Sequence, residues 1–148
     1  MGAKQLRGMP RRGFTLVELG VAVVIIGILV TMVVPSFMRV SEQNKVDAAA
    51  QYLRSIWSAE RIYWLEHRTF TDSLSDLSAL GLIDAKIAAG SDGFYAYSIS
   101  AATSTTFTVN AARSGSDVWT GTLHINQDGD VTGFVGGSNS VVLLPPDI

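Results

Sequence analysis

Apolar and polar positions divide the chain into three stretches with different patterns. The first stretch, residues 14–38, is apolar and contains a single charged residue, Glu18, close to its start. From Leu19 to Met38, twenty consecutive residues carry no charge. A helix of that length crosses the hydrocarbon core of a bilayer, which is about 30 Å thick. The first stretch is therefore predicted to be a transmembrane helix.

The second stretch, residues 39–67, has apolar residues at helical spacing and contains no glycine or proline. The larger ones fall on one face, with two alanines between them: Val46, Ala49, Ala50, Leu53, Ile56, Trp57, Tyr63 and Trp64. The pattern predicts an amphipathic helix that continues the membrane helix and packs on a sheet or against other helices. Aromatic residues at this spacing favour packing in a core over ligand stacking or electron transfer.

Glycine and proline interrupt the membrane half of this long helix at Gly20, Gly27 and Pro35. Pro35 has no backbone N–H and clashes with the preceding turn, so a kink is predicted there. The glycines permit close approach of neighbouring helices in a membrane.

The periodicity changes after residue 67. Residues 68–92 contain short apolar pieces separated by serine, threonine, aspartate and glycine, which predicts a loop with one short helix at about 74–80. The remainder, 93–148, predicts three or four antiparallel strands, at 93–99, 105–111, 118–125 and 130–135. The Asp-Gly pair at 128–129 favours a hairpin between the last two. Two interpretations stay open for 141–144, an edge strand or a contact with another subunit.

Positive charge is concentrated ahead of the apolar stretch. Residues 1–13 contain four basic residues and no acidic one: Lys4, Arg7, Arg11 and Arg12. Such a segment holds the N-terminus in the cytoplasm. Glu18, in contrast, places a carboxylate at the edge of a lipid-immersed helix, where an acid costs about 2.5–3.5 kcal/mol at the centre and less near the edge. A carboxylate in this position is expected to have a partner.

The motif GFTLVE at residues 13–18, between the basic segment and the apolar run, resembles the class III leader of type IV pilins and type II secretion pseudopilins. The resemblance implies that a membrane peptidase cuts after Gly13, removes residues 1–13 as a leader, and methylates the new terminal amine of Phe14. It also implies that Glu18 neutralises the terminal amine of a neighbouring subunit. Opposite charges attract strongly in such a low-dielectric environment.

The fold implied by the resemblance is an α+β, type IV pilin-like fold. Its long N-terminal helix, with a membrane half at 14–38 and an amphipathic half at 39–67, packs on a three- to four-stranded antiparallel sheet within 93–148. Residues 68–92 correspond to the αβ-loop of such proteins. In related filaments the segment between such a glycine and proline loses helicity outside the bilayer, and Gly27 to Pro35 is the matching segment here.

The expected function is that of a structural subunit of a type IV pilus-like filament, polymerised through its N-terminal helix. The precursor is expected to cross the inner membrane once, and the product to be an extracellular or periplasmic filament. Expected partners are copies of the chain, the prepilin peptidase and a pilus or secretion assembly platform. One alternative is a pseudopilin of a type II secretion system. Another is an exported binding or enzymatic domain that uses the helix only as a signal anchor.

Little in the sequence indicates catalysis, a cofactor or a metal. The alternation of Asn126, Asp128 and Asp130 faintly resembles a calcium loop, but the loop's later glycine and glutamate are missing, so a hairpin turn is favoured. His67 and His124 lie far apart and are interpreted as structural or solvated. No nucleophile–base, phosphate-binding or paired-carboxylate motif is present, which predicts a protein that is not an enzyme.

Cysteine content and net charge restrict what can hold the C-terminal region and which partners are expected. The chain has no cysteine, so the C-terminal disulfide of many type IV pilins is replaced by packing or by a metal. Removal of residues 1–13 changes the net charge from −2 to −6, because 7 basic and 13 acidic residues remain. An acidic subunit gives no support for general nucleic-acid binding.

Overall fold

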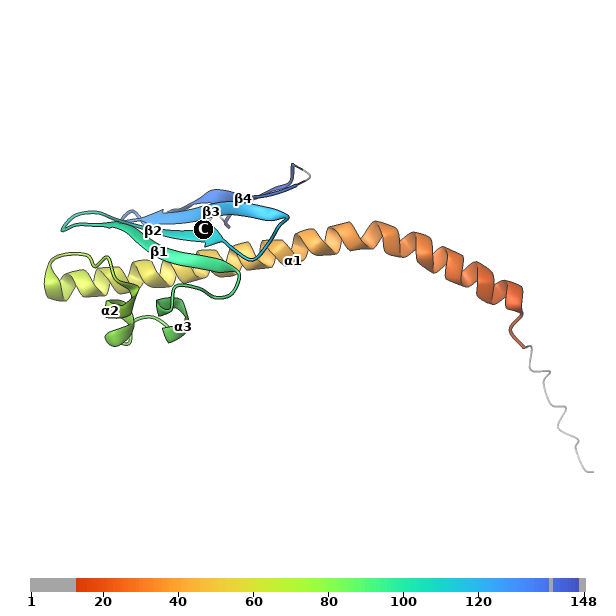
Figure 1. Ribbon diagram of the computed structural model, residues 1–148, viewed down its shortest axis with the longest axis horizontal. Helices are drawn as coiled ribbons and strands as arrows, with labels where there is room; N and C mark the ends of the chain where they lie inside the picture. The colour runs from red at the N-terminus through yellow and green to blue at the C-terminus, as the bar shows by residue number, and fades with distance from the viewer. Residues whose placement is uncertain (1–12, 139, 147–148) are drawn as a thin grey trace, which may run out of the picture. The chain divides into compact units, whose positions relative to one another are not determined.

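The computed structural model describes residues 13–138 and 140–146. The chain forms two compact units, one up to Arg39 and one from Val40 onward. The first helix, α1 (Leu16–His67), is continuous through both units (Figure 1). It ends at His67, and the next residue, Arg68, adopts a positive φ of 57° and donates its N–H to the Trp64 carbonyl at 2.8 Å. The predicted end of the amphipathic helix is therefore confirmed.

The second unit contains an antiparallel sheet of five strands in sequence order: β1 (Tyr95–Ala102), β2 (Phe107–Arg113), β3 (Trp119–Asn126), β4 (Val131–Gly137) and β5 (Val142–Leu143). The α+β arrangement of a long helix on an antiparallel sheet is confirmed. The sheet has one strand more than the three or four predicted. Strand β5 has only two residues, too few to show an alternating pattern, and it pairs with β4 at the sheet edge.

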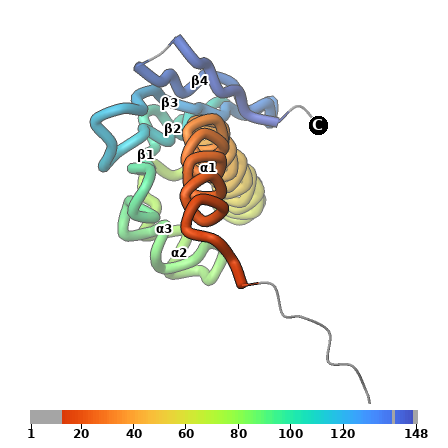
Figure 2. The backbone as a smooth tube through the Cα atoms, turned by 90° about the vertical axis from the view of Figure 1, so that its right-hand side faces the viewer, coloured from red at the N-terminus to blue at the C-terminus, as the bar shows by residue number. Residues whose placement is uncertain are grey.

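The sheet and the two short helices of the loop region lie on different sides of α1 within the second unit (Figures 1 and 2). The loop region contains α2 (Leu74–Ala79), capped by Ser73, and α3 (Ala85–Ala88), capped by Asp84. The sequence predicted the first of these helices. It did not indicate α3, because a four-residue helix shows too little of the helical period.

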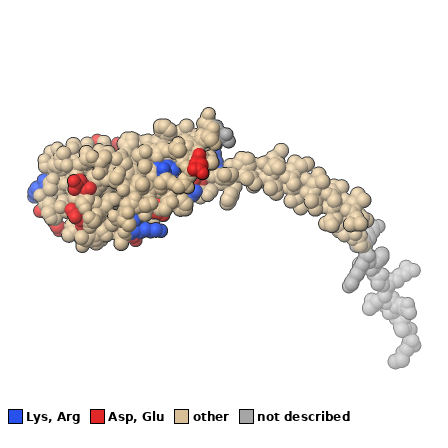
Figure 3. Space-filling view, viewed as in Figure 1, with Lys and Arg blue, Asp and Glu red and all other residues tan. Residues whose placement is uncertain are grey.

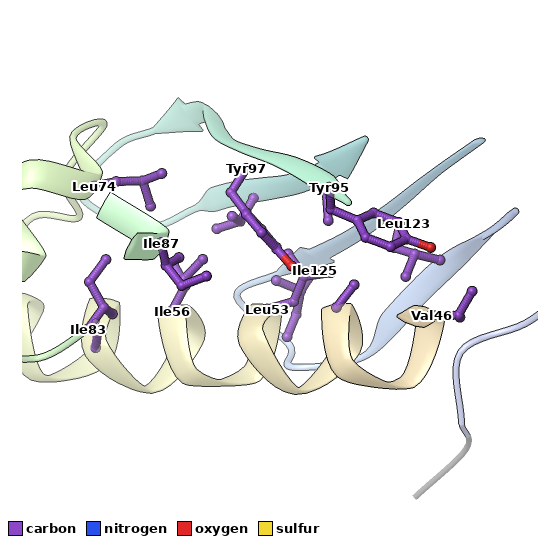
Figure 4. Packing of buried hydrophobic residues seen from close by; sticks show 14 of the residues in the cluster. Val46, Leu53, Ile56, Leu74, Ile83, Ile87, Tyr95, Tyr97, Leu123 and Ile125 are labelled. Carbon is purple, nitrogen blue, oxygen red and sulfur yellow. The ribbon is translucent and has the colours of Figure 1, made fainter. Parts of the chain in front are cut away.

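The core of the second unit lies between α1, the sheet and these short helices (Figure 4). Helix α1 contributes a fully buried row, which includes Val46, Leu53 and Ile56. The predicted apolar face is thus confirmed, and Trp57 and Tyr63 pack partly buried against the same core. The sheet and loop supply the facing side chains, among them Ile87, Tyr95, Val109, Leu123 and Ile125.

The turn between β3 and β4 is a hairpin turn closed by its own polar groups. Gly129 donates its N–H to the Asn126 carbonyl at 3.1 Å, and Asp128 donates its N–H to Asn126 Oδ1 at 3.0 Å. Trp57 Nε1 donates to the Gln127 carbonyl at 3.1 Å, so the turn is also fastened to α1. The predicted hairpin is confirmed, and the side-chain oxygen of Asn126 accepts a hydrogen bond within the turn.

The C-terminal tail is held along α1 by packing and hydrogen bonds. Leu143 is buried in the core. Gln43 Nε2 donates to the Leu144 carbonyl at 3.0 Å, and an Arg54 guanidinium nitrogen donates to the Pro146 carbonyl at 3.1 Å. Packing, one of the two predicted replacements for a disulfide, thus fastens this region to the helix.

Candidate assembly site

The first turn of α1 is capped by Thr15 and Glu18. The Thr15 carbonyl accepts the first helical hydrogen bond, from the Leu19 N–H at 3.1 Å, which makes Thr15 the N-cap. The Glu18 N–H donates to Thr15 Oγ1 at 3.2 Å, and the Thr15 N–H donates to Glu18 Oε2 at 2.9 Å. These reciprocal bonds form a capping box. A third bond, from Thr15 Oγ1 to Glu18 Oε2 at 2.9 Å, ties the two side chains directly.

The capping box holds the Glu18 carboxylate at the amino end of the helix. There it faces the positive end of the helix dipole, close to the residue that precedes Thr15 in the chain, Phe14. The sequence interpretation assigned Glu18 only a partner in another copy, and it missed Thr15. The signal was present, since threonine followed three residues later by glutamate, ahead of an apolar run, is the pattern of a capping box.

Gly13 and Phe14 precede the helix in irregular backbone and are exposed. A Cβ atom added to Gly13 would meet no other atom within 4 Å. The described part of the chain therefore sets no steric requirement for glycine at this position.

The membrane half of α1 presents apolar side chains on all sides. Every residue from Phe14 to Met38 is exposed apart from Ala22, which is intermediate. Helix α1 is long and apolar enough to cross a membrane, and the face of this segment seen in Figure 3 shows no charged side chain. Apolar surface of this extent is stable only against lipid or against other protein.

The segment from Gly27 to Pro35 is helical throughout in the isolated chain. Thr31 Oγ1 donates to the Ile28 carbonyl at 2.7 Å, so the hydroxyl is satisfied within its own helix. A Cβ at Gly27 would meet nothing within 4 Å. Loss of helicity on leaving the bilayer, and a kink at Pro35, stay predictions.

A buried ion pair joins α1 to β2 in the second unit. The Arg113 guanidinium donates to both carboxylate oxygens of Glu42, to Oε2 at 3.2 Å, and also to the Phe94 carbonyl at 2.9 Å. Lys45 Nζ lies 2.8 Å from Glu42 Oε2. Burial opposes ionisation of Glu42, but the hydrogen bonds and charges of Arg113 and Lys45 outweigh it and lower the pKa of this carboxyl.

A second buried carboxyl, Glu60, has no basic partner within ion-pair distance in the described part of the chain. Its Oε2 accepts the Thr71 N–H at 3.1 Å, whereas its Oε1 is buried without a hydrogen-bond partner among the described atoms. Burial, with the nearby charge of Asp72, raises the pKa of Glu60 to about 7, against the effect of the Thr71 hydrogen bond. Glu60 thus links α1 to the loop that leads into α2.

Comparison with known proteins finds a matching family profile and several similar bacterial proteins. The family profile described as the prokaryotic N-terminal methylation motif matches residues 8–34. The chain is similar to the type IV major pilin protein PilA of Myxococcus xanthus, with 32% identity over 66 residues, which covers 45% of this chain and 30% of that protein. It is also similar to the type II secretion system core protein G of Pseudomonas aeruginosa, with 40% identity over 68 residues, which covers 46% of this chain and 48% of that protein.

A longer match is to the type IV wide pilus major component PilA4 of Thermus thermophilus. It has 25% identity over 108 residues, which covers 73% of this chain and 78% of that protein. The chain spans a third to a half of the length of the first two relatives.

Proposed function

We propose that the chain is a member of the family of type IV pilins and type II secretion pseudopilins and the structural subunit of a type IV pilus-like filament. The methylation motif at residues 8–34 and the similarity to PilA and to core protein G support this. The observation that carries the proposal is the Thr15–Glu18 capping box, which begins two residues after Gly13 and opens the exposed, apolar half of α1. The Glu18 carboxylate lies four residues after Phe14, the proposed site of the new terminal amine, which supports the proposal.

Processing is the first proposed step. The prepilin peptidase cuts between Gly13 and Phe14 and methylates the Phe14 amine, which leaves the mature chain with a cation ahead of the N-cap. Before that step, the basic segment 1–13 keeps the N-terminus in the cytoplasm, and the apolar half of α1 crosses the inner membrane once.

Assembly follows from the two properties of this helix. Apolar helices leave the lipid and pack against one another in the filament core, with van der Waals packing rather than escape from water as the driving force. The Glu18 carboxylate pairs with the Phe14 amine of a neighbouring copy, which removes two charges that would otherwise be unpaired in a low-dielectric core. The capping box holds the carboxylate in place for that partner.

Mass spectrometry of the membrane and filament fractions tests the processing step. The expected mature chain begins at an N-methylated Phe14, and a Gly13→Leu variant is expected to keep its leader and to stay out of filaments. A mature chain that still begins at Met1 and does not polymerise would contradict the proposal and favour a membrane tether.

A second candidate function is that of a type II secretion pseudopilin. The 40% identity to the core protein G of P. aeruginosa supports it. The PilA4 match favours the pilus, because it extends over 73% of this chain and includes a large part of the second unit. A deletion strain separates the two: loss of surface filaments supports the pilus, and accumulation of exported proteins in the periplasm supports the secretion system.

A further inference from the structure

An apolar groove lies at the carboxyl end of α1, between the helix and two turns of the sheet. Its volume is about 460 Å³, and it is lined by Arg61, Ile62, Trp64, Leu65, Phe70, Ser104, Thr105 and Gln127. Ile62 and Leu65 are 45% and 66% exposed, although both are large and aliphatic. This size and lining are typical of sites that bind a partner group.

The walls of the groove are fixed by hydrogen bonds to the turn between β1 and β2. Trp64 Nε1 donates to the Ser104 carbonyl at 2.8 Å, and the Phe70 N–H donates to the Thr103 carbonyl at 3.0 Å. The Trp64 and Phe70 rings lie 6.4 Å apart, and Phe70 packs on the buried Phe107 at 4.6 Å. The groove is therefore preformed in the isolated subunit.

Two arginines lie beside the apolar lining. The Arg61 guanidinium lies 4.9 Å from the Trp57 ring, and that of Arg68 lies 5.1 Å from the Trp64 ring. Neither forms an ion pair among residues 13–138 and 140–146, where both ion pairs involve Glu42. The groove thus combines an apolar floor with two cations that are open to an acidic partner.

The outward surface of α2 has the complementary character. Leu80, the C-cap residue that follows α2, is 48% exposed, and Asp76 lies one turn before it on the same face. Asp72 and Asp84 are exposed on either side of this helix, and residues 69–85 contain no basic residue. This surface, formed by Asp72, Asp76, Leu80 and Asp84, is called the α2 surface below.

We propose that the groove binds the α2 surface of a second copy of the chain, with Leu80 between Ile62 and Leu65 and the aspartates facing Arg61 and Arg68. This proposal rests on the proposed function as a filament subunit and names one contact between subunits. Because the two surfaces differ, the contact is heterologous. A pair of subunits joined in this way leaves one groove and one α2 surface unused, at opposite ends of the pair. Such contacts generate open helical assemblies rather than closed dimers.

Another exposed apolar group, Phe134, Val142 and Leu144, lies on β4, β5 and the tail. The strands that carry it, β4 and β5, contain no carboxylate to face Arg61 and Arg68. The charges therefore favour the α2 surface as the occupant, and this second group provides the comparison in the experiment.

Cysteine cross-linking tests the contact, because the chain has no cysteine of its own. Leu65→Cys and Leu80→Cys change two exposed positions and are co-expressed for assembly, then oxidised. The expected result is a disulfide-linked dimer in filaments that contain both variants and no dimer in filaments of either variant alone. A chain that carries both substitutions is expected to give a ladder of disulfide-linked multimers. Leu65→Cys with Leu144→Cys is the matched control and is expected to stay monomeric on a non-reducing gel.

The outcomes separate this contact from the proposed function. Filaments that form normally but give no Leu65→Cys with Leu80→Cys dimer would overturn the contact alone. A dimer with Leu144→Cys in its place would assign the groove to the β4–β5 surface. Failure of the unmodified chain to form filaments would overturn the proposed function and this contact with it.

Discussion

Gly121 on β3 and Gly133 on β4 lie diagonally across the two strands, on either side of the Thr122–Phe134 pair. A Cβ on Gly121 would lie 2.2 Å from the Phe134 carbonyl oxygen, and a Cβ on Gly133 would lie 2.2 Å from that of Thr122. Both residues have positive φ, 148° and 104°. Side chains at either position would collide with backbone, which cannot move aside without breaking the pairing of β3 with β4.

Gly121→Ala and Gly133→Ala are therefore each expected to destabilise the protein, by about 1–3 kcal/mol or more, because strain adds to the steric clash. Gly136→Ala is the matched control on β4, since a Cβ there would lie 3.9 Å from its nearest neighbours. Chemical unfolding in detergent measures the difference. Equal stability of the three variants would contradict the close approach.

The Glu42–Arg113 ion pair supports a second prediction. Arg113→Met removes the main partner of a buried carboxylate, and the expected loss in free energy of unfolding is about 3–5 kcal/mol. Glu42→Gln in the same chain is expected to recover part of the loss, because the uncompensated charge is then gone. Additive effects of the two substitutions in a double-mutant cycle would show that the pair is not coupled.

Glu60 predicts a pH dependence of stability. Its pKa is raised in the folded protein from the ordinary value of 4.5 to about 7, so the folded state holds this proton more tightly than the unfolded chain. The contribution of Glu60 to the stability of the folded state is therefore fully present below about pH 4.5, and it is lost as the pH rises to about 7. The difference between the two pKa values corresponds to a change of at most about 3 kcal/mol in the free energy of unfolding.

Glu60→Gln removes the titrating group and is expected to flatten stability between pH 4.5 and 7 relative to the natural chain. Glu66→Gln, an exposed position on the same helix, is the control and is expected to keep the natural profile. Urea unfolding at a series of pH values measures both. Parallel profiles for the natural chain and Glu60→Gln would mean that Glu60 ionises in the folded protein as it does in the unfolded chain.

The capping box supports a fourth prediction, on assembly. Thr15→Val keeps the shape of the side chain and loses the hydroxyl, which costs the helix end about 1 kcal/mol and leaves Glu18 less well held. Filament yield is expected to fall, whereas Thr15→Ser is expected to assemble normally. Glu18→Ala is expected to insert into the membrane and to fail in assembly more completely than Thr15→Val.

Electron microscopy and sedimentation of sheared filaments measure these yields, and membrane fractionation checks insertion. Normal filaments from Glu18→Ala would remove the charge pair from the assembly mechanism. Equal yields from Thr15→Val and Thr15→Ser would show that the hydroxyl contributes nothing to it.

The sequence determined those features that depend on neighbouring residues. The apolar run, the helical spacing of Val46, Leu53 and Ile56, and the hairpin before β4 are local patterns, and the structure has each of them. The residues of the candidate site are likewise local in the sequence, because the motif GFTLVE sets Gly13, Phe14 and Glu18 within six consecutive residues. The capping box is also local, because it needs only threonine and glutamate three residues apart.

Only the tertiary structure decided which distant groups meet. Arg113 reaches Glu42 across 71 residues, and Gln43 holds the tail across 101, without any pattern that links them in the sequence. Glu60 is a charged residue of a kind usually exposed on a helix. It is buried here because the loop at Thr71 lies against this part of α1. The groove likewise needs α1 and two sheet turns at once. Such contacts arise from packing of the whole unit, so no local window of residues specifies them.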